Sequence, residues 1–187
     1  MKWSQLKKRI EDNFAASVHG RVEVWSTRYR HAHDQDGEAW ITFDGQRVIS
    51  LATYSYEVEA GQVRNEIRRT SGCVDYRNPE HQAGYYSAYD EADRIVNYQG
   101  FYPLWEFNKA LFAYLNLSID DALRSTDPLT KALGILDRRF GKRRLKDFDQ
   151  AGESVLVKKM YEYRCICEGT VAADSRLQTE EMSYQAP

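Results

Sequence analysis

A short cationic run carries the strongest chemical signal in the sequence. Guanidinium and ammonium groups bind carboxylates and phosphates. The chain as a whole has 26 basic and 28 acidic residues, so its net field does not attract polyanions and any such binding must be local. The run, with Lys146 beside it, predicts a basic contact surface at residues 138–146. Its members are Arg138, Arg139, Lys142, Arg143 and Arg144.

Helix-end chemistry explains part of this run. A helix is predicted to begin at Asp127-Pro128 and to follow an apolar stripe as far as Phe140. If Gly141 takes the left-handed conformation that ends many helices, Arg138 and Arg139 lie in the last turn, where the helix dipole stabilises cations. The remaining cations are left without a structural reason. They are solvated or paired within the chain, they dock an acidic protein partner, or they contact the phosphates of a nucleic acid.

A second group of residues has the spacing of metal ligands. His31 and His33 lie two positions apart, so on a strand both imidazoles would share a face and could chelate Zn²⁺ or Ni²⁺ together with Asp34. The same segment continues into Asp-Gln-Asp-Gly, which is ordinary turn sequence, and no third histidine or cysteine follows at a diagnostic spacing. We therefore favour a hairpin tip here and expect no cofactor.

The sequence contains no recognisable catalytic motif. Gly-x-Ser-x-Gly, His-Glu-x-x-His and the dinucleotide-binding glycine pattern do not occur. A binding function is therefore favoured over catalysis. An enzyme or metal protein centred on His31, His33 and Asp34 stays as the third hypothesis.

An aromatic strand face offers a different binding surface. Alternation along two predicted strands places on one side Trp25, Thr27, Tyr29, Trp40 and Thr42. Aromatic rings on an open sheet, with arginines at the rim, could stack single-stranded bases. Nucleic-acid binding, through this face or through the basic run, is therefore the alternative function. We expect instead that the helices following the sheet cover this face, because they need an apolar partner.

These side chains must be positioned by a small sheet and several helices. Residues 3–14 have the spacing of an amphipathic helix, and alternation predicts strands over 21–29, 39–43 and 48–54. Asp44-Gly45 is a two-residue hairpin signal between the last two strands. Beyond Tyr56 the period turns helical. The fold class is therefore α+β, a three-stranded antiparallel meander with one helix before it and several helices after it.

Length and composition favour one soluble domain. The 187 residues suffice for a single core, and we assign 1–170 to one α+β domain and 171–187 to a loosely ordered C-terminal tail. The N-terminus is too charged for a signal peptide, and no segment reaches a membrane-spanning apolar length. Three cysteines, an odd number, fit a reducing compartment, so we expect a cytoplasmic protein without membrane contact.

A family resemblance is carried by five segments, which are residues 3–11, residues 20–24 leading to Tyr29-Arg30, residues 40–42, residues 114–120 and residues 136–145. On these segments the chain resembles a family of uncharacterised bacterial cytoplasmic proteins, conserved hypotheticals with no established activity. The resemblance implies a single cytoplasmic domain and supplies no catalytic residues. The leading hypothesis is then a non-enzymatic interaction module that uses the basic surface near 138–146.

Overall fold

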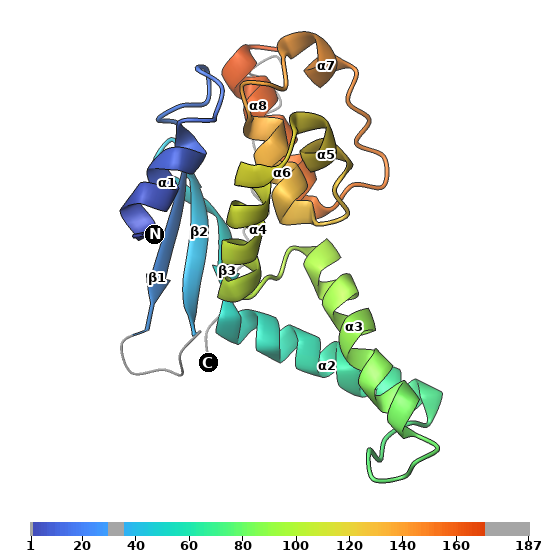
Figure 1. Ribbon diagram of the computed structural model, residues 1–187. Coiled ribbons are helices and arrows are strands. Elements are labelled where there is room, and N and C mark those ends of the chain that lie inside the picture. The colour runs from blue at the N-terminus through green and yellow to red at the C-terminus, as the bar shows by residue number, and fades with distance from the viewer. Residues whose placement is uncertain (1, 30–35, 171–187) are drawn as a thin grey trace.

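The computed structural model describes residues 2–29 and 36–170, which form an α+β fold (Figure 1). One helix precedes a three-stranded sheet and the other described helices follow it, as the sequence predicted. Among the described residues, no helix is long and apolar enough to cross a membrane. The elements are α1 (Trp3–Glu11), β1 (Val22–Arg28), β2 (Gly37–Phe43), β3 (Gln46–Ala52), α2 (Thr53–Ser71), α3 (Gln82–Gln99), α4 (Leu104–Asn116), α5 (Ile119–Arg124), α6 (Pro128–Leu136), α7 (Lys142–Lys146) and α8 (Val155–Glu168).

Helix α1 closes one edge of the sheet. Its apolar stripe buries Leu6 and Ile10, as their spacing predicted. The carboxylate of Glu11, its last residue, accepts a hydrogen bond of 2.9 Å from the backbone N–H of Val24 in β1. An edge strand leaves such groups unpaired unless another element covers them. Helix α1 therefore satisfies a backbone group on the open edge of β1, and it also packs on the core.

The sheet is an antiparallel meander in the order β1-β2-β3. Asp44 and Gly45 join β2 to β3 with φ angles of 48° and 80°, the left-handed pair that an Asp-Gly hairpin turn requires. In the register, Val24 lies opposite Ile41 and Trp25 lies opposite Trp40. Because side chains alternate along a strand, the two valine and isoleucine positions share one face and the two tryptophans share the other.

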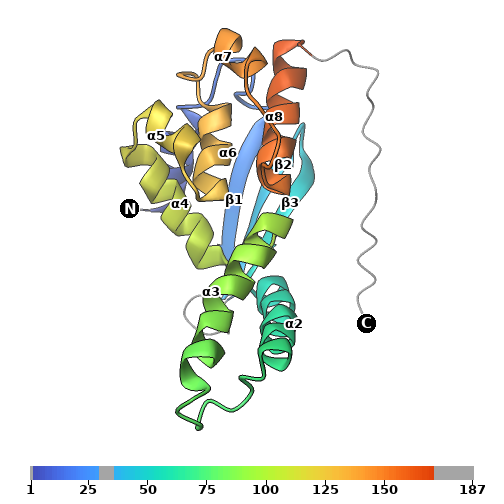
Figure 2. The same cartoon turned by 90° about the vertical axis from the view of Figure 1, so that its right-hand side faces the viewer.

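The helices that follow the sheet pack against the face that carries Val24 and Ile41 (Figure 2). At the end of β2, Phe43 stacks on Tyr163 of α8 with ring centroids 4.5 Å apart. The expectation that these helices cover Trp25 and Trp40 is therefore wrong. The tryptophan face also carries Glu23 and Glu38, whose charges make burial of this face unfavourable. The helices instead bury their apolar side chains against each other and against the opposite face of the sheet.

Helix α6 ends earlier than the sequence predicted. It stops at Leu136, because Asp137 takes an extended conformation with ψ of 139°. Asp137 is the C-cap residue of the helix and is buried. Gly141 has φ of −70° and is the N-cap of α7, so the prediction of a left-handed glycine that ends the preceding helix is wrong. Arg138 and Arg139 consequently lie in a turn between two helices and not in a last helical turn.

Helices α2 and α3 form an arm, residues 53–100, which projects from the rest of the molecule (Figures 1 and 2). The left-handed glycines Gly72 and Gly100 end the two helices. A second, smaller apolar cluster of Tyr56, Ala60 and Val96 lies where the arm joins the body, packed against side chains that include Phe101 and Trp105. The main core lies between the sheet and helices α4, α6 and α8.

Candidate binding surface

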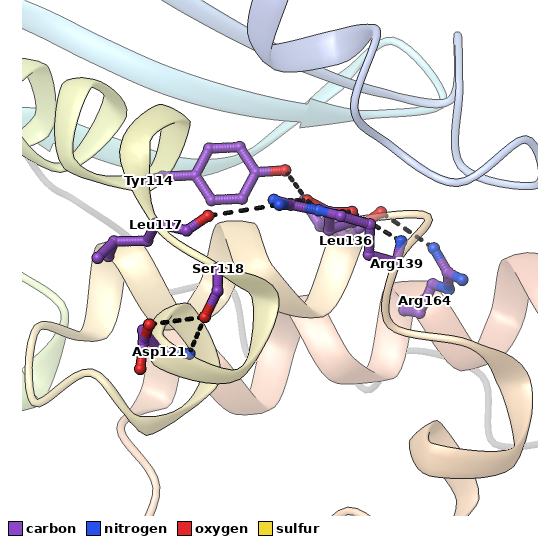
Figure 3. Close-up of polar contacts among 8 residues, drawn as sticks. Tyr114, Leu117, Ser118, Asp121, Leu136, Arg139 and Arg164 are labelled. Atoms are coloured by element: carbon purple, nitrogen blue, oxygen red, sulfur yellow. Dashed lines mark hydrogen bonds and ion pairs between the residues drawn. The ribbon is translucent and has the colours of Figure 1, made fainter.

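The basic loop, residues 137–146, lies at the end of the molecule opposite the arm (Figure 1). Its first residue, Asp137, is fully buried and anchors the loop to α4. The Tyr114 hydroxyl donates a hydrogen bond of 2.5 Å to one carboxylate oxygen, and Arg139 Nη2 donates one of 2.7 Å to the same oxygen (Figure 3). The backbone N–H of Arg139 donates to the other oxygen at 2.7 Å. Both oxygens therefore have partners.

The electrostatics of this carboxylate are those of a structural group. Burial alone would raise the pKa of the Asp137 carboxyl group, but hydrogen bonds from Arg139 and Tyr114 outweigh burial and hold the pKa below its ordinary value. Burial and the bond to Asp137 together raise the pKa of the Tyr114 hydroxyl. At neutral pH the carboxylate is ionised and its donors keep their protons. The Asp137 carboxylate therefore holds the loop in place, and neither of its oxygens is free to act as a general base.

A second anchor comes from α8, where Arg164 is almost completely buried. Its guanidinium donates to the backbone carbonyls of Leu136 at 3.0 Å and Phe140 at 3.3 Å, which lie on either side of the turn. It also forms an ion pair of 2.9 Å with Glu168, one helical turn away. Burial lowers the pKa of Arg164, and the negative charge of Glu168 partly offsets that effect.

Glu168 joins three parts of the chain at one buried carboxylate. Besides Arg164, it accepts a 2.6 Å hydrogen bond from the Ser17 hydroxyl and forms a 2.7 Å ion pair with Lys142 of α7. Burial would raise the pKa of the Glu168 carboxyl group, but the donors Lys142 and Ser17, with the nearby Arg164 charge, hold the pKa below its ordinary value. The basic loop is thereby fixed to α8 and to the segment after α1.

The segment after α4 supplies a further contact. Ser118 caps α5 by accepting a hydrogen bond from the backbone N–H of Asp121, and its hydroxyl also donates to the Asp121 carboxylate (Figure 3). Asp120, in the same short helix, forms a 2.6 Å ion pair with Arg144 of the loop. Arg139 also donates to the carbonyl of Leu117 at 3.3 Å. Segments 114–120 and 136–145 therefore meet in space.

The five cations predicted as a binding site divide into two groups. Arg139, Lys142 and Arg144 pair with carboxylates of the same chain. Within the described residues, Arg138 and Arg143 have exposed side chains that form no ion pair, and Lys146 is exposed and unpaired in the same way. Intramolecular pairing thus explains half of the loop's six cations. The outward-facing set consists of Arg138, Arg143 and Lys146.

The predicted metal ligands do not enter the described structure. His31, His33 and Asp34 lie within residues 30–35, outside the described residues. Across residues 2–29 and 36–170, the structure brings together no group of three or more histidine, cysteine, aspartate or glutamate side chains that could hold a metal ion.

The tryptophan face of the sheet is already occupied by cations. Trp25 and Trp40 stack with ring centroids 6.2 Å apart. Lys7 of α1 places its ammonium 3.3 Å from the centroid of Trp25, and the Arg47 guanidinium lies 4.4 Å from the centroid of Trp40. Cation–π contacts of this kind are attractive and compete with any other group for the ring face. A base that stacked here would have to displace one of these side chains.

Sequence reasoning missed Arg164 and Glu168. Neither residue belongs to the cationic run, the histidine pair or the aromatic strand face. The available signal was an Arg-Glu pair at spacing i,i+4 that falls among inward-facing residues such as Met160 and Tyr163. A charged pair on the apolar side of a helix indicates a buried ion pair.

Comparison with known proteins gives a match to one protein family. No curated protein and no solved structure matches the chain. Residues 2–165 match the SF0329 protein family, a range that includes α1, the sheet, the arm and the whole basic loop. The chain therefore belongs to the SF0329 protein family.

Proposed function

We propose that this protein is a non-enzymatic binding module that docks an acidic protein partner on its basic loop. The observation that carries the proposal is the division of the loop's charges. Three cations are paired inward and hold the loop in place, while Arg138, Arg143 and Lys146 face outward without a carboxylate among the described residues. Arginine is a common anchor of protein interfaces, and its planar group matches a carboxylate.

The way the loop is anchored supports this proposal. Buried charged groups such as Asp137, Arg164 and Glu168 are costly to desolvate, and a well-packed apolar residue often serves stability equally well. These groups instead hold the backbone between α6 and α7 in one conformation. A surface that is already ordered loses less conformational entropy when a partner binds.

Nucleic-acid binding is the second candidate. The outward cations could also contact phosphates, and this is the observation in its favour. Against it, the aromatic face has its rings covered by Lys7 and Arg47, and the chain's net charge is −2. With three unpaired cations and no available stacking platform on that face, an acidic protein is the better supported partner.

We further propose that the module acts in the bacterial cytoplasm. The three cysteines are free, at positions 73, 165 and 167, which is the usual state in a reducing compartment. Cys165 is buried and the other two are partly buried.

An affinity capture from bacterial cytoplasmic extract tests the proposed function. The immobilised protein is exposed to extract with and without nuclease at low ionic strength, and bound material is eluted with salt. We expect an acidic protein that is retained after nuclease treatment and that salt releases, because exposed charge pairs are screened within about 10 Å at 0.1 M. Retention of nucleic acid alone would favour the second candidate, and retention of no acidic protein would contradict the proposal.

A further inference from the structure

The arm carries most of the exposed large apolar side chains of the described chain. Of ten large apolar side chains that are exposed, seven lie on the arm, although the arm holds less than a third of the described residues. Exposed large apolar side chains that gather on one part of a protein often belong to an interaction site. The seven are Tyr54, Val58, Val74, Tyr76, Tyr86, Tyr89 and Tyr98.

The outer half of the arm buries only small apolar side chains such as Ala88. The small cluster of Tyr56, Ala60 and Val96 lies at its base. Farther out, the two helices are joined by Arg68, whose guanidinium lies 3.5 Å from the centroid of Tyr85, and whose Nε donates to the Tyr85 carbonyl. Arg68 is 9% exposed, and within the described residues its buried Nη2 has no acceptor. In the outer half of the arm, the two helices thus pack mainly on each other, whereas stable domains are built from at least two packed layers of secondary structure.

The charges of the arm point to a protein partner and not to a polyanion. Arginines at positions 64, 68, 69, 77 and 94 are outnumbered by acidic residues at positions 57, 59, 66, 75, 80, 90, 91 and 93. An acidic arm does not attract nucleic acid or anionic lipid. Because the arm carries charges of both signs, arginines of one copy can meet carboxylates of the other across a two-fold axis, where residue i contacts residue j and j contacts i.

The size of the arm is adequate for such pairing. Its helices have 19 and 18 residues. At about 1.5 Å rise per residue and about 10 Å width per helix, two helices side by side present a face of about 550 Å². Two such faces together reach the ~1,000 Å² that a specific interface needs. Antiparallel helical pairs commonly complete their packing as a four-helix bundle.

From these observations we propose that the arm is the interface with a second copy of this chain, formed when the α2–α3 pairs of two protomers pack face to face. This surface lies at the end of the molecule opposite the basic loop, so the inference is independent of the proposed function (Figure 1). Tyr54 and Tyr86, which are 75% and 57% exposed, are the side chains expected to lose most solvent contact.

Sedimentation velocity over a concentration series tests the proposal. We expect the full chain to sediment with twice its 21.8 kDa mass at high concentration and to dissociate on dilution. Tyr54→Glu and Tyr86→Glu should each raise the dissociation constant by about 30-fold, the effect of losing an interface anchor. Phe112→Glu is the matched control, since Phe112 is 45% exposed on α4, outside the arm, and should leave the dissociation constant unchanged.

Hydrogen exchange locates the interface without any substitution. Diluting the wild-type protein through the dissociation constant should speed amide exchange in α2 and α3 and leave β1–β3 unchanged. A protein that sediments as a monomer at every concentration up to about 100 µM would overturn the proposal, because a specific dimer is populated there. A dimer whose protected amides lie outside the arm would overturn it equally.

Discussion

Tyr114 and Asp137 lie 23 positions apart in the chain and are joined by a buried hydrogen bond of 2.5 Å. The bond ties the last turn of α4 to the turn that ends α6. Arg139 completes the group by donating to the same carboxylate, so the basic loop begins at a point fixed by three side chains. This contact positions the outward cations that follow.

Removing the Tyr114 hydroxyl should destabilise the protein without changing its shape. In Tyr114→Phe, the Asp137 carboxylate loses one of its buried donors, so we expect the free energy of unfolding to fall by about 1–3 kcal/mol in urea denaturation. Tyr98→Phe is the control, because Tyr98 is 49% exposed and its hydroxyl makes only a 3.4 Å contact with the Gly152 carbonyl. Equal losses in the two variants would contradict the role given to the buried bond.

Acid should weaken the anchors of the loop. The pKa values of the Asp137 and Glu168 carboxyl groups are held below their ordinary values in the folded protein. Their contribution to stability is therefore complete above the unfolded pKa of about 4 and is lost as the pH falls through the lower folded pKa. We expect Asp137→Asn to show a smaller decrease in unfolding free energy between pH 5 and pH 3 than the wild type in urea titrations. An identical decrease would show that Asp137 is not linked to folding.

Breaking the buried ion pair should cost more than removing both partners. Glu168→Gln leaves the buried Arg164 guanidinium without its carboxylate partner, and we expect a loss of about 3–5 kcal/mol in unfolding free energy. The double variant Arg164→Met, Glu168→Gln should lose less than the single variant, because no unpaired buried guanidinium remains. Arg124→Met, which removes an exposed pair with Asp121, should cost less than about 1 kcal/mol. A double variant that is less stable than Glu168→Gln would contradict this account.

Gly141 and Gly100 should respond differently to alanine. Gly141 has φ of −70° with open space where a Cβ would lie, so thermal denaturation of Gly141→Ala should change the unfolding free energy by less than about 0.5 kcal/mol. Gly100 has φ of 100°, and Gly100→Ala should cost about 1 kcal/mol or more because alanine is strained there. A large loss of unfolding free energy in Gly141→Ala would contradict this account and indicate a left-handed Gly141.

Local sequence signals were sufficient for much of the fold. The leucine and isoleucine spacing of α1, the alternation of β1 and the Asp44-Gly45 turn each depend on nearby residues, and the structure confirms all three. The Asp127-Pro128 pair likewise starts α6 as predicted. In each case the stabilising contact lies within a few positions along the chain.

The site depended on contacts that sequence periodicity does not encode. The apolar stripe predicted that α6 would continue to Phe140, but Asp137 ends the helix because its partner Tyr114 comes from another helix. The same applies to Arg139 and Lys142, whose carboxylate partners depend on the loop's folded path. The cationic run was therefore identified, whereas the division between anchoring and outward cations required the structure.

Charge reversal of the outward cations tests the central claim most directly. The measurement is the amount of acidic protein retained from nuclease-treated extract by immobilised wild type and by the triple variant Arg138→Glu, Arg143→Glu, Lys146→Glu. A matched control reverses three exposed cations elsewhere that make no ion pair among the described residues, namely Arg94, Lys158 and Lys159. The account predicts that the loop variant keeps the wild-type melting temperature and loses retention, while the control retains the protein. Undiminished retention by the folded loop variant would contradict it.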